Sequence, residues 1–125
     1  MQSQRFDHTI LLAHGSRDPQ WSAPFRDLIV KLQEGNPHIS LAFMELCEPS
    51  LEDEIKRAHN RGERNLAILP LFFAAGRHLR EDVPAQLTDI QSKLPVTLAL
   101  LPAIGEQSAF VSFIEKLVLD LTAGN

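Results

Sequence analysis

The sequence predicts an α/β fold: a four-stranded parallel sheet in the order 2-1-3-4 with helices on both faces. Four short apolar runs alternate with four amphipathic stretches, and the third run is apolar almost throughout, as a strand buried on both faces is. No linker-like or low-complexity tract interrupts this alternation. Repeated strand–helix units favour right-handed parallel crossovers. We therefore expect residues 1–125 to form a single domain.

The first two strand–helix units are defined by apolar runs and helix boundary signals. The first run, Thr9–Ala13, precedes a helical pattern over residues 25–32. The second run, Ile39–Leu46, leads to Ser50, which is a good helix cap and is followed by acidic residues that suit a helix amino terminus. We expect that helix to end near Gly62, a typical stop residue.

The third and fourth units complete the alternation. The third run, Asn65–Leu71, passes through small residues at 74–76 to a predicted helix from Pro84 to Lys93. The fourth run, Val96–Leu101, is followed by a predicted helix over Glu106–Leu121.

Composition narrows the class of protein. The chain has 125 residues, 44% hydrophobic and 22% charged, which are proportions of an ordinary globular domain. A net charge of −4 argues against a nucleic-acid or anionic-membrane partner. Cys47 is the single cysteine, so neither an intrachain disulfide nor a cysteine zinc cluster can form. With no signal-peptide pattern and no membrane-length apolar run, we expect a soluble, cytoplasmic protein.

Two histidines follow strands that should be neighbours in this sheet. Ligands of such sheets bind beyond the carboxyl ends of the strands, where the strand order reverses. His14 follows the first strand and His78 follows the third. Adjacent strands lie about 4.8 Å apart, so the two imidazoles can share one divalent ion such as Co, Ni, Fe or Zn. Glu45, near the end of the second strand, can bind the ion or accept a proton and would leave coordination positions open.

The histidines and the cysteine can also be interpreted as structural or surface residues. Either histidine alone can serve only to hydrogen-bond the backbone of a turn. His8, His38 and His59 are expected at or near the opposite end of the sheet, as surface residues. Cys47 is expected to be a small packing residue next to a strand end.

Three arginines lie in the same two loops as the histidines: Arg17, Arg77 and Arg80. They are either solvated surface residues or the binding groups for a substrate that carries several carboxylates. Trp21, Phe72 and Phe73 are more typical of packing residues than of ring-stacking ones.

At these positions the sequence resembles the small class II chelatases of the CbiX and SirB type, the sirohydrochlorin cobaltochelatases and ferrochelatases. The matching stretches occur in the same order and at similar spacing over nearly the whole chain: His14-Gly15-Ser16-Arg17, Phe43-Met44-Glu45-Leu46 with Glu48-Pro49-Ser50-Leu51, and Pro70-Leu71-Phe72 leading through Gly76 and His78 to Asp82-Val83-Pro84. One departure is the run of residues 72–75, Phe-Phe-Ala-Ala, where relatives often carry leucines.

The resemblance implies a chelatase-like fold, equivalent to a flavodoxin-like half of the longer chelatases. It implies a lyase that inserts Co²⁺, Fe²⁺ or also Ni²⁺ into sirohydrochlorin during cobalamin or sirohaem biosynthesis. The metal would be a substrate, and no organic cofactor is implied. The resemblance assigns metal binding to His14 and His78, and an acidic partner role to Glu45.

Metal insertion requires a dehydrated ion, a bent macrocycle and removal of two N–H protons. His14 and His78 would hold the ion or accept these protons, and Glu45 would assist them. Phe72, Phe73 and the small residues up to Gly76 would form an apolar wall for the flat ring, while the three arginines hold its carboxylates.

The resemblance also implies a homodimer, because chains this short correspond to half of a tandem chelatase. The last predicted helix supports this independently, since its apolar stripe is wider than one buried face needs. The stripe comprises Phe110, Val111, Phe113, Ile114, Leu117, Val118, Leu119 and Leu121.

Two rival functions differ in class. A non-catalytic metal or tetrapyrrole carrier would use the same histidines. A phosphatase or hydrolase is disfavoured, because a histidine phosphatase needs arginine where Ala13 precedes His14, and no Gly-x-Ser-x-Gly elbow exists. The ligand types do not identify the metal, since divalent affinities follow a common order.

Overall fold

The computed structural model describes residues 5–122, which contain one parallel sheet in the order β2-β1-β3-β4. The strands are β1 (His8–Ala13), β2 (Ile39–Phe43), β3 (Asn65–Pro70) and β4 (Thr97–Leu100). The helices are α1 (Pro19–Gly35), α2 (Leu51–Asn60), α3 (Val83–Lys93) and α4 (Ser108–Thr122). A π-helical turn, His78–Asp82, precedes α3, and a 3₁₀ turn, Ile104–Glu106, precedes α4. The predicted fold class and strand order are confirmed.

The central strand β1 pairs in parallel with both of its neighbours. Leu11 lies opposite Leu41 on one side and Leu69 on the other, so the three strands are in register across the sheet. Because parallel strands share direction, the segments after Ala13, Phe43 and Pro70 all leave the sheet at the same edge.

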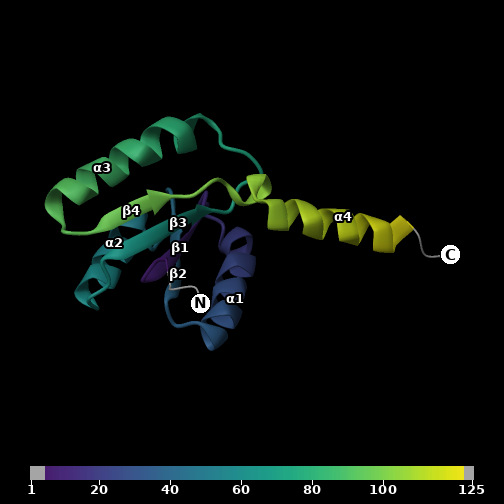
Figure 1. Ribbon diagram of the computed structural model, residues 1–125, viewed down its shortest axis with the longest axis horizontal. Helices are drawn as coiled ribbons and strands as arrows, with labels where there is room; N and C mark the ends of the chain where they lie inside the picture. The colour runs from purple at the N-terminus through teal and green to yellow at the C-terminus, as the bar shows by residue number, and fades with distance from the viewer. Residues whose placement is uncertain (1–4, 123–125) are drawn as a thin grey trace.

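Helices cover the two faces of the sheet unequally. Helices α2 and α3 pack on one face of the sheet (Figure 1). The core on this face includes Ile10 and Ile68 from the strands, Ile55 from α2 and Ile90 from α3. On the other face α1 packs over residues of β1 and β2, and Trp21 lies 4.8 Å from Phe25 between ring centroids. Side chains alternate between the two faces along each strand, so they contribute to two separate cores. Trp21 has the packing role that the sequence suggested.

The fourth helix, α4, projects away from the sheet rather than lying on it (Figure 1). None of its residues is buried. Within residues 5–122, no helix combines the length and the apolar character that crossing a membrane requires.

Two helices begin at side-chain caps. Ser50 Oγ accepts a hydrogen bond of 3.1 Å from Asp53 N, as predicted, and α2 ends shortly before Gly62. Asp18 Oδ1 accepts one of 2.9 Å from Gln20 N, so α1 begins at Pro19, well before the predicted residue 25. Proline at the first helical position and the aspartate cap are start signals that the apolar periodicity does not contain.

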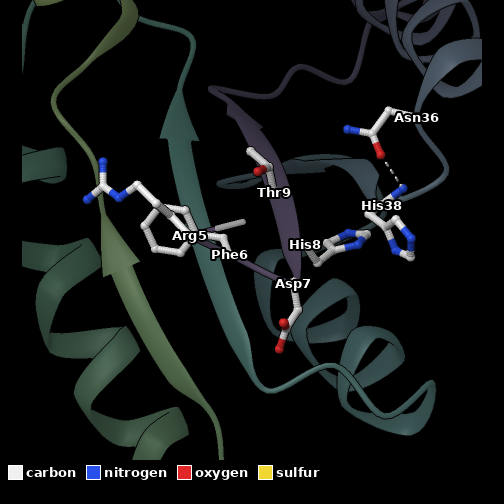
Figure 2. Close-up of a pocket in the computed structure, with 7 residues that line it drawn as sticks. All are labelled: Arg5, Phe6, Asp7, His8, Thr9, Asn36 and His38. Carbon is white, nitrogen blue, oxygen red and sulfur yellow. Dashed lines mark hydrogen bonds between the residues drawn. The ribbon is translucent and has the colours of Figure 1, made fainter. Parts of the chain in front are cut away.

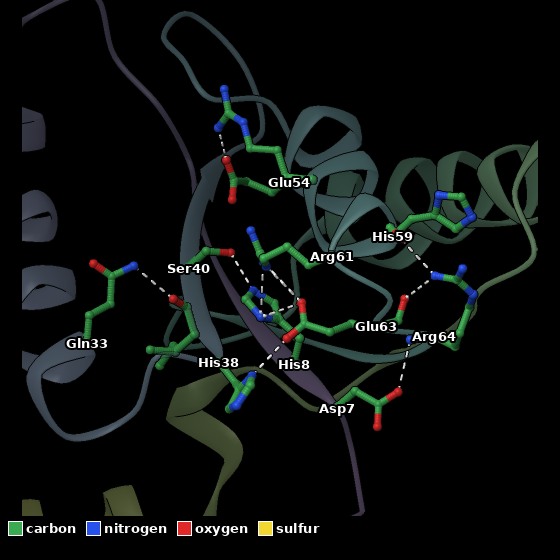
Figure 3. A network of polar contacts seen from close by, with 12 residues as sticks. Asp7, His8, Gln33, His38, Ser40, Glu54, His59, Arg61, Glu63 and Arg64 are labelled. Atoms are coloured by element: carbon green, nitrogen blue, oxygen red, sulfur yellow. Dashed lines mark hydrogen bonds and ion pairs between the residues drawn. The ribbon is translucent and has the colours of Figure 1, made fainter.

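His8 is buried, so its prediction as a surface residue is wrong. It is the first residue of β1 and is only 2% exposed. Its Nε2 atom lies 2.9 Å from Ser40 Oγ, and its Nδ1 atom lies 3.3 Å from Glu63 Oε1 (Figure 3). Burial of this imidazole is tolerated because both ring nitrogens have polar partners from other parts of the chain. His38 is exposed, as predicted, and His59 is half-buried.

Glu63 links two histidines and an arginine at the amino-terminal end of the sheet. Its carboxylate lies 2.8 Å from His38 Nδ1 and 3.1 Å from an Arg61 guanidinium nitrogen. Burial on its own raises the pKa of Glu63, but the hydrogen bond from His38 and the charges of His8 and Arg61 outweigh it, so the net pKa lies below 4.5. Burial lowers the pKa of His8 below 6.5, against the opposing charge of Glu63.

A pocket of about 400 Å³ opens beside this network (Figure 2). It lies at the start of β1, whereas His14 follows the end of that strand. Asp7, His8 and His38 are among its lining residues. Asp7 accepts hydrogen bonds from the backbone N–H groups of Arg64 and Asn65, which lower the pKa of its carboxyl group. The side chain of Asp7 therefore links the start of β1 to the start of β3, as well as lining the pocket.

The buried His8 should make the protein sensitive to mild acid. Its folded-state pKa is depressed, so the unfolded chain takes up a proton near pH 6.5 that the folded chain resists. The free energy of unfolding should therefore decrease as the pH falls below 6.5, until the folded-state pKa is reached. Urea unfolding measured between about pH 7 and pH 5 should show a shallower decrease for His8→Gln than for the wild type. His59→Gln is the control and should follow the wild type, whereas equal slopes for all three proteins would contradict this account.

Candidate metal centre

The first half of the site forms where β1 and β2 leave the sheet together. Their pairing continues past the strands, because Met44 N donates to Ala13 O (2.9 Å) and Glu45 N donates to His14 O (3.2 Å). This backbone contact places the two side chains next to each other. His14 Nε2 lies 3.5 Å from Glu45 Oε2, with both side chains about half exposed, at 53% and 57%.

Gly15 allows this close approach. Its φ of +111° is in the region that favours glycine, and a Cβ atom there would overlap the carbonyl oxygen of Glu45. The His14-Gly15 step therefore depends on a residue without a side chain. This is a physical reason for glycine at this position, independent of any family resemblance.

The second half of the site comes from the segment after β3. Leu71 N donates to Leu12 O at 2.8 Å, which holds the start of this segment beside β1. The ring of Phe72 then lies 5.9 Å from the imidazole of His14, tilted by 49°. His78 follows as the first residue of the π-helical turn, and its side chain is 70% exposed.

Asp82 contacts His78 and was not assigned a role from the sequence. Its Oδ2 atom lies 2.6 Å from His78 Nδ1. A carboxylate in this position orients the ring and favours the tautomer with hydrogen on Nδ1, which leaves the Nε2 lone pair for a metal ion. The i, i+4 spacing of the two residues on a helical turn is the sequence signal that can identify such a pair.

His14 and His78 border a common pocket of about 210 Å³. The other residues that line it are Met44, Phe72, Ala74, Gly76, Arg77 and Leu79. The structure thus brings together two histidines that are 64 residues apart in the chain. Glu45 reaches this pocket only through its contact with His14.

The donors do not form a preassembled metal cage. Within residues 5–122, no three His, Cys, Asp or Glu side chains lie close enough to hold one ion. Instead, two imidazole–carboxylate pairs flank the pocket, His14 with Glu45 and His78 with Asp82. Such an arrangement can offer one or two nitrogen ligands to an ion while leaving its other coordination positions open.

The predicted substrate-binding residues divide into two groups. Phe72, Gly76 and Arg77 line the pocket, and Arg77 Nε lies 3.5 Å from Glu81 Oε1 in solvent. Arg17 and Arg80 are exposed and are not among the lining residues. These two arginines can therefore bind only those groups of a ligand that extend beyond the pocket.

Phe73 lies outside the pocket, in contrast to the predicted apolar wall. Its side chain is 77% exposed, and its ring packs edge-on against Phe110 of α4 with 5.6 Å between centroids. The ring of Phe72 lies beside His14 whereas the ring of Phe73 lies against α4, so only Phe72 belongs to the apolar wall. Cys47 is half-buried and packs at the edge of the α1 core, as predicted.

These features define a protein of the parallel α/β class with two imidazoles beyond the carboxyl ends of neighbouring strands, on one pocket. The chain belongs to the CbiX family, whose model matches residues 8–121. It is 30% identical to the sirohydrochlorin cobaltochelatase of Sulfolobus acidocaldarius over 72% of this chain and 73% of that protein. It is 31% identical to that of Methanopyrus kandleri over 62% of this chain but 56% of the relative. It is also 31% identical to the chloroplastic sirohydrochlorin ferrochelatase of Arabidopsis thaliana, over 66% of this chain and 38% of that protein.

Solved structures agree with this membership. A crystal structure described as that of a cobalamin (vitamin B12) biosynthesis CbiX protein from Marinobacter aquaeolei VT8 has a TM-score of 0.82 and 38% identity, and the match covers 91% of this chain and 93% of that one. SirB from Bacillus subtilis with Fe³⁺ has a TM-score of 0.71 at 20% identity, over 92% of this chain and 48% of SirB. The SirB likeness shows the shared fold.

Replacing Gly15 should disturb the site from the backbone. Gly15→Ala forces a methyl group into the Glu45 carbonyl at an unfavourable φ, so we expect a loss of about 1–3 kcal/mol in unfolding free energy. Gly35→Ala is the matched control, because nothing lies within 4 Å of a Cβ there, and it should change stability by about 0.5 kcal/mol or less. Denaturant unfolding measures both values, and equal stabilities would contradict the steric argument.

Removing the charge of Asp82 should weaken metal binding through His78. Asp82→Asn loses the carboxylate that orients the ring, and we expect the apparent Kd for Co²⁺ to rise by roughly 10–100-fold. Glu81→Gln is the control, since Glu81 pairs with Arg77 and not with a histidine. Titration followed by calorimetry, repeated across pH, tests the role: an orienting carboxylate changes the pH dependence of binding, and an unchanged profile would argue against it.

Proposed function

We propose that this protein inserts a divalent metal ion into sirohydrochlorin and so acts as a chelatase, a lyase of cobalamin or sirohaem biosynthesis. The observation that carries the proposal is the position of His14 and His78 on one pocket at the carboxyl end of the sheet. The names of the relatives, sirohydrochlorin cobaltochelatase and ferrochelatase, support the reaction and its substrate.

The reaction replaces two pyrrole N–H protons with one divalent ion, so the site must supply the ion and remove two protons. His78 would offer Nε2 to the ion, because Asp82 occupies the Nδ1 side of its ring. His14 would accept the two protons in turn and pass each to water, and the carboxylate of Glu45, 3.5 Å away, would stabilise the imidazolium that forms each time. The ion, Co²⁺, Fe²⁺ or Ni²⁺, is a substrate and leaves with the product.

The macrocycle would lie across the mouth of the pocket. At about 210 Å³ the pocket is smaller than the roughly 300–1,000 Å³ of drug-sized ligand sites, so a tetrapyrrole cannot enter it whole. Phe72, Ala74 and Gly76 present an apolar surface to the ring beside the two histidines. Arg77 at the rim, with Arg17 and Arg80 further out, would bind the peripheral carboxylates.

The proposal also covers the domain organisation, the oligomeric state, the location and the partners of the protein. We infer that residues 1–125 form a single chelatase-like domain that acts as a homodimer in the cytoplasm, without nucleic-acid or membrane partners. The family match over residues 8–121 supports the single domain. The exposed apolar residues of α4 support a dimer, and the net charge of −4 disfavours anionic partners.

Substitution of the histidines tests the mechanism. In an anaerobic absorbance assay with sirohydrochlorin and Co²⁺, Fe²⁺ or Ni²⁺, His14→Ala and His78→Ala should each lower kcat/KM by about 10²–10⁴-fold. The reason is that each variant removes a group that holds the ion or accepts a proton. His59→Ala, on α2 and away from the pocket, is the control and should keep the wild-type rate.

The same assay separates a catalyst from a carrier. A chelatase should metallate many equivalents of sirohydrochlorin per protein chain, whereas a carrier would stop at one equivalent. Wild-type rates in both histidine variants would contradict the mechanism even if turnover were observed.

A further inference from the structure

The backbone of Leu41 faces the outer edge of the sheet. β2 is an edge strand, and its parallel pairing with β1 fixes the direction of its backbone groups. Thr9 N donates to His38 O at 3.0 Å, and Met44 N donates to Ala13 O at 2.9 Å. Even-numbered positions along this stretch therefore face β1, and odd-numbered ones face outward. The N–H and C=O groups of Leu41 thus point away from β1.

Other parts of the chain occupy this edge on both sides of Leu41. On one side, Gln33 Nε2 donates to Ile39 O at 2.9 Å (Figure 3). On the other, Phe43 N donates to Pro49 O at 2.9 Å. Between these two contacts, no residue in the range 5–122 bonds to the outward N–H or C=O group of Leu41, which is only 6% exposed. Backbone groups with so little access to water normally have a partner, so this gap suits a ligand that both donates and accepts.

The gap lies in a trough of about 360 Å³ along the outer edge of β2, which we call the edge trough. Leu41 is among its lining residues. Helix α1 lines one side of the trough, with Ile29 and Val30, and α2 lines the other, with Glu54 and Arg57. The edge trough shares no lining residue with the pocket that His14 and His78 border.

The two sides of the edge trough differ in chemistry. On the α1 side, the apolar side chain of Val30 is 57% exposed. On the α2 side, the carboxylate of Glu54 is only 6% exposed and pairs with Arg57, whose side chain is 60% exposed. Arg26 also lines the trough, so basic side chains outnumber acidic ones there, two to one, although the chain has a net charge of −4. The trough therefore favours an acidic ligand with an apolar group.

We propose that the edge trough binds a short extended segment of another protein, which adds to the sheet as a strand antiparallel to β2. In the hydrogen-bonded pair of an antiparallel ladder, one residue exchanges both of its backbone bonds with the residue opposite. A gap of one residue, at Leu41, is the length that such a pair needs. Strand addition of this kind draws affinity from main-chain bonds and specificity from alternate side chains. The inference does not depend on the proposed function.

The pairing also predicts the sequence of the bound segment. Residues that lie opposite each other in a β pair share a face of the sheet. The residue opposite Leu41 would lie on the α1 side, where Leu41 packs and Val30 is exposed, so it should be apolar. Its two neighbours would point towards α2, where Arg57 lies, so they should be acidic. The β2 edge of a second copy does not match, because Ser40 and Ala42 flank its Leu41.

Titration of the isotope-labelled full chain with a capped peptide, Ser-Glu-Leu-Glu-Ser, tests the proposal by NMR. The amide signal of Leu41 should shift in a saturable manner. N-methylation of the peptide's leucine removes the N–H that would donate to Leu41 O and should weaken binding by at least about 10-fold. N-methylation of the following glutamate is the matched control and should have little effect, because that N–H points away from β2 in an antiparallel pair. Equal affinities of the two methylated peptides would overturn the proposal, and so would the absence of a saturable shift.

Substitutions on α1 provide a second measurement. Val30→Glu places a carboxylate where the apolar residue of the peptide would pack, and it should weaken binding by about 10-fold. Lys31→Glu is the matched control: it changes the charge by more, but Lys31 is exposed and does not line the trough, so the change should stay below about twofold. Similar losses in both variants would show that only the overall charge matters and would overturn the proposal. A Leu41 amide signal that moves with protein concentration, without peptide, would assign the edge to a second copy instead.

Discussion

The parallel pairing of β1 with both β2 and β3 is the constraint on which the candidate site depends. Backbone hydrogen bonds continue past the strand ends, from Met44 N to Ala13 O and from Leu71 N to Leu12 O. The segments that carry His14, Glu45 and His78 are therefore positioned by the backbone. Their side chains can remain more than half exposed without losing their relative positions. A rigid scaffold that presents solvent-accessible ligands suits a reaction in which a large flat substrate must approach from outside.

The incomplete ligand set is consistent with a metal that is a substrate. A structural metal site closes around its ion, usually with four protein ligands, and contributes to folding. Here His14 and His78 border the pocket but no third donor completes a group, within the part of the chain that the structure describes. An ion held by so few ligands keeps open positions that pyrrole nitrogens can occupy. Because few protein ligands hold the ion, the metallated product can also leave the site.

Much of this arrangement could be predicted from the sequence, because strand order alone gathers residues at one edge. The positions of His14 and His78 after strands β1 and β3 were sufficient to expect them at a common pocket. The burial of His8 could not be predicted, since its partners Ser40 and Glu63 come from distant segments. Apolar periodicity revealed the stripe on α4 but not its direction, which depends on the contact between Gly105 and Phe73.

Histidines lie at both ends of the sheet, and their hydrogen-bond partners determine which of them can still bind a metal ion. Both ring nitrogens of His8 face partners, Ser40 on one side and Glu63 on the other, so no lone pair remains for an ion. In His78 only Nδ1 is occupied, by Asp82, and the remaining nitrogen belongs to a ring that is 70% exposed. A histidine held by a single carboxylate is oriented yet still able to bind a metal. A histidine held on both sides instead stabilises the fold. This difference separates the two ends of the sheet into a structural cluster and a site for chemistry.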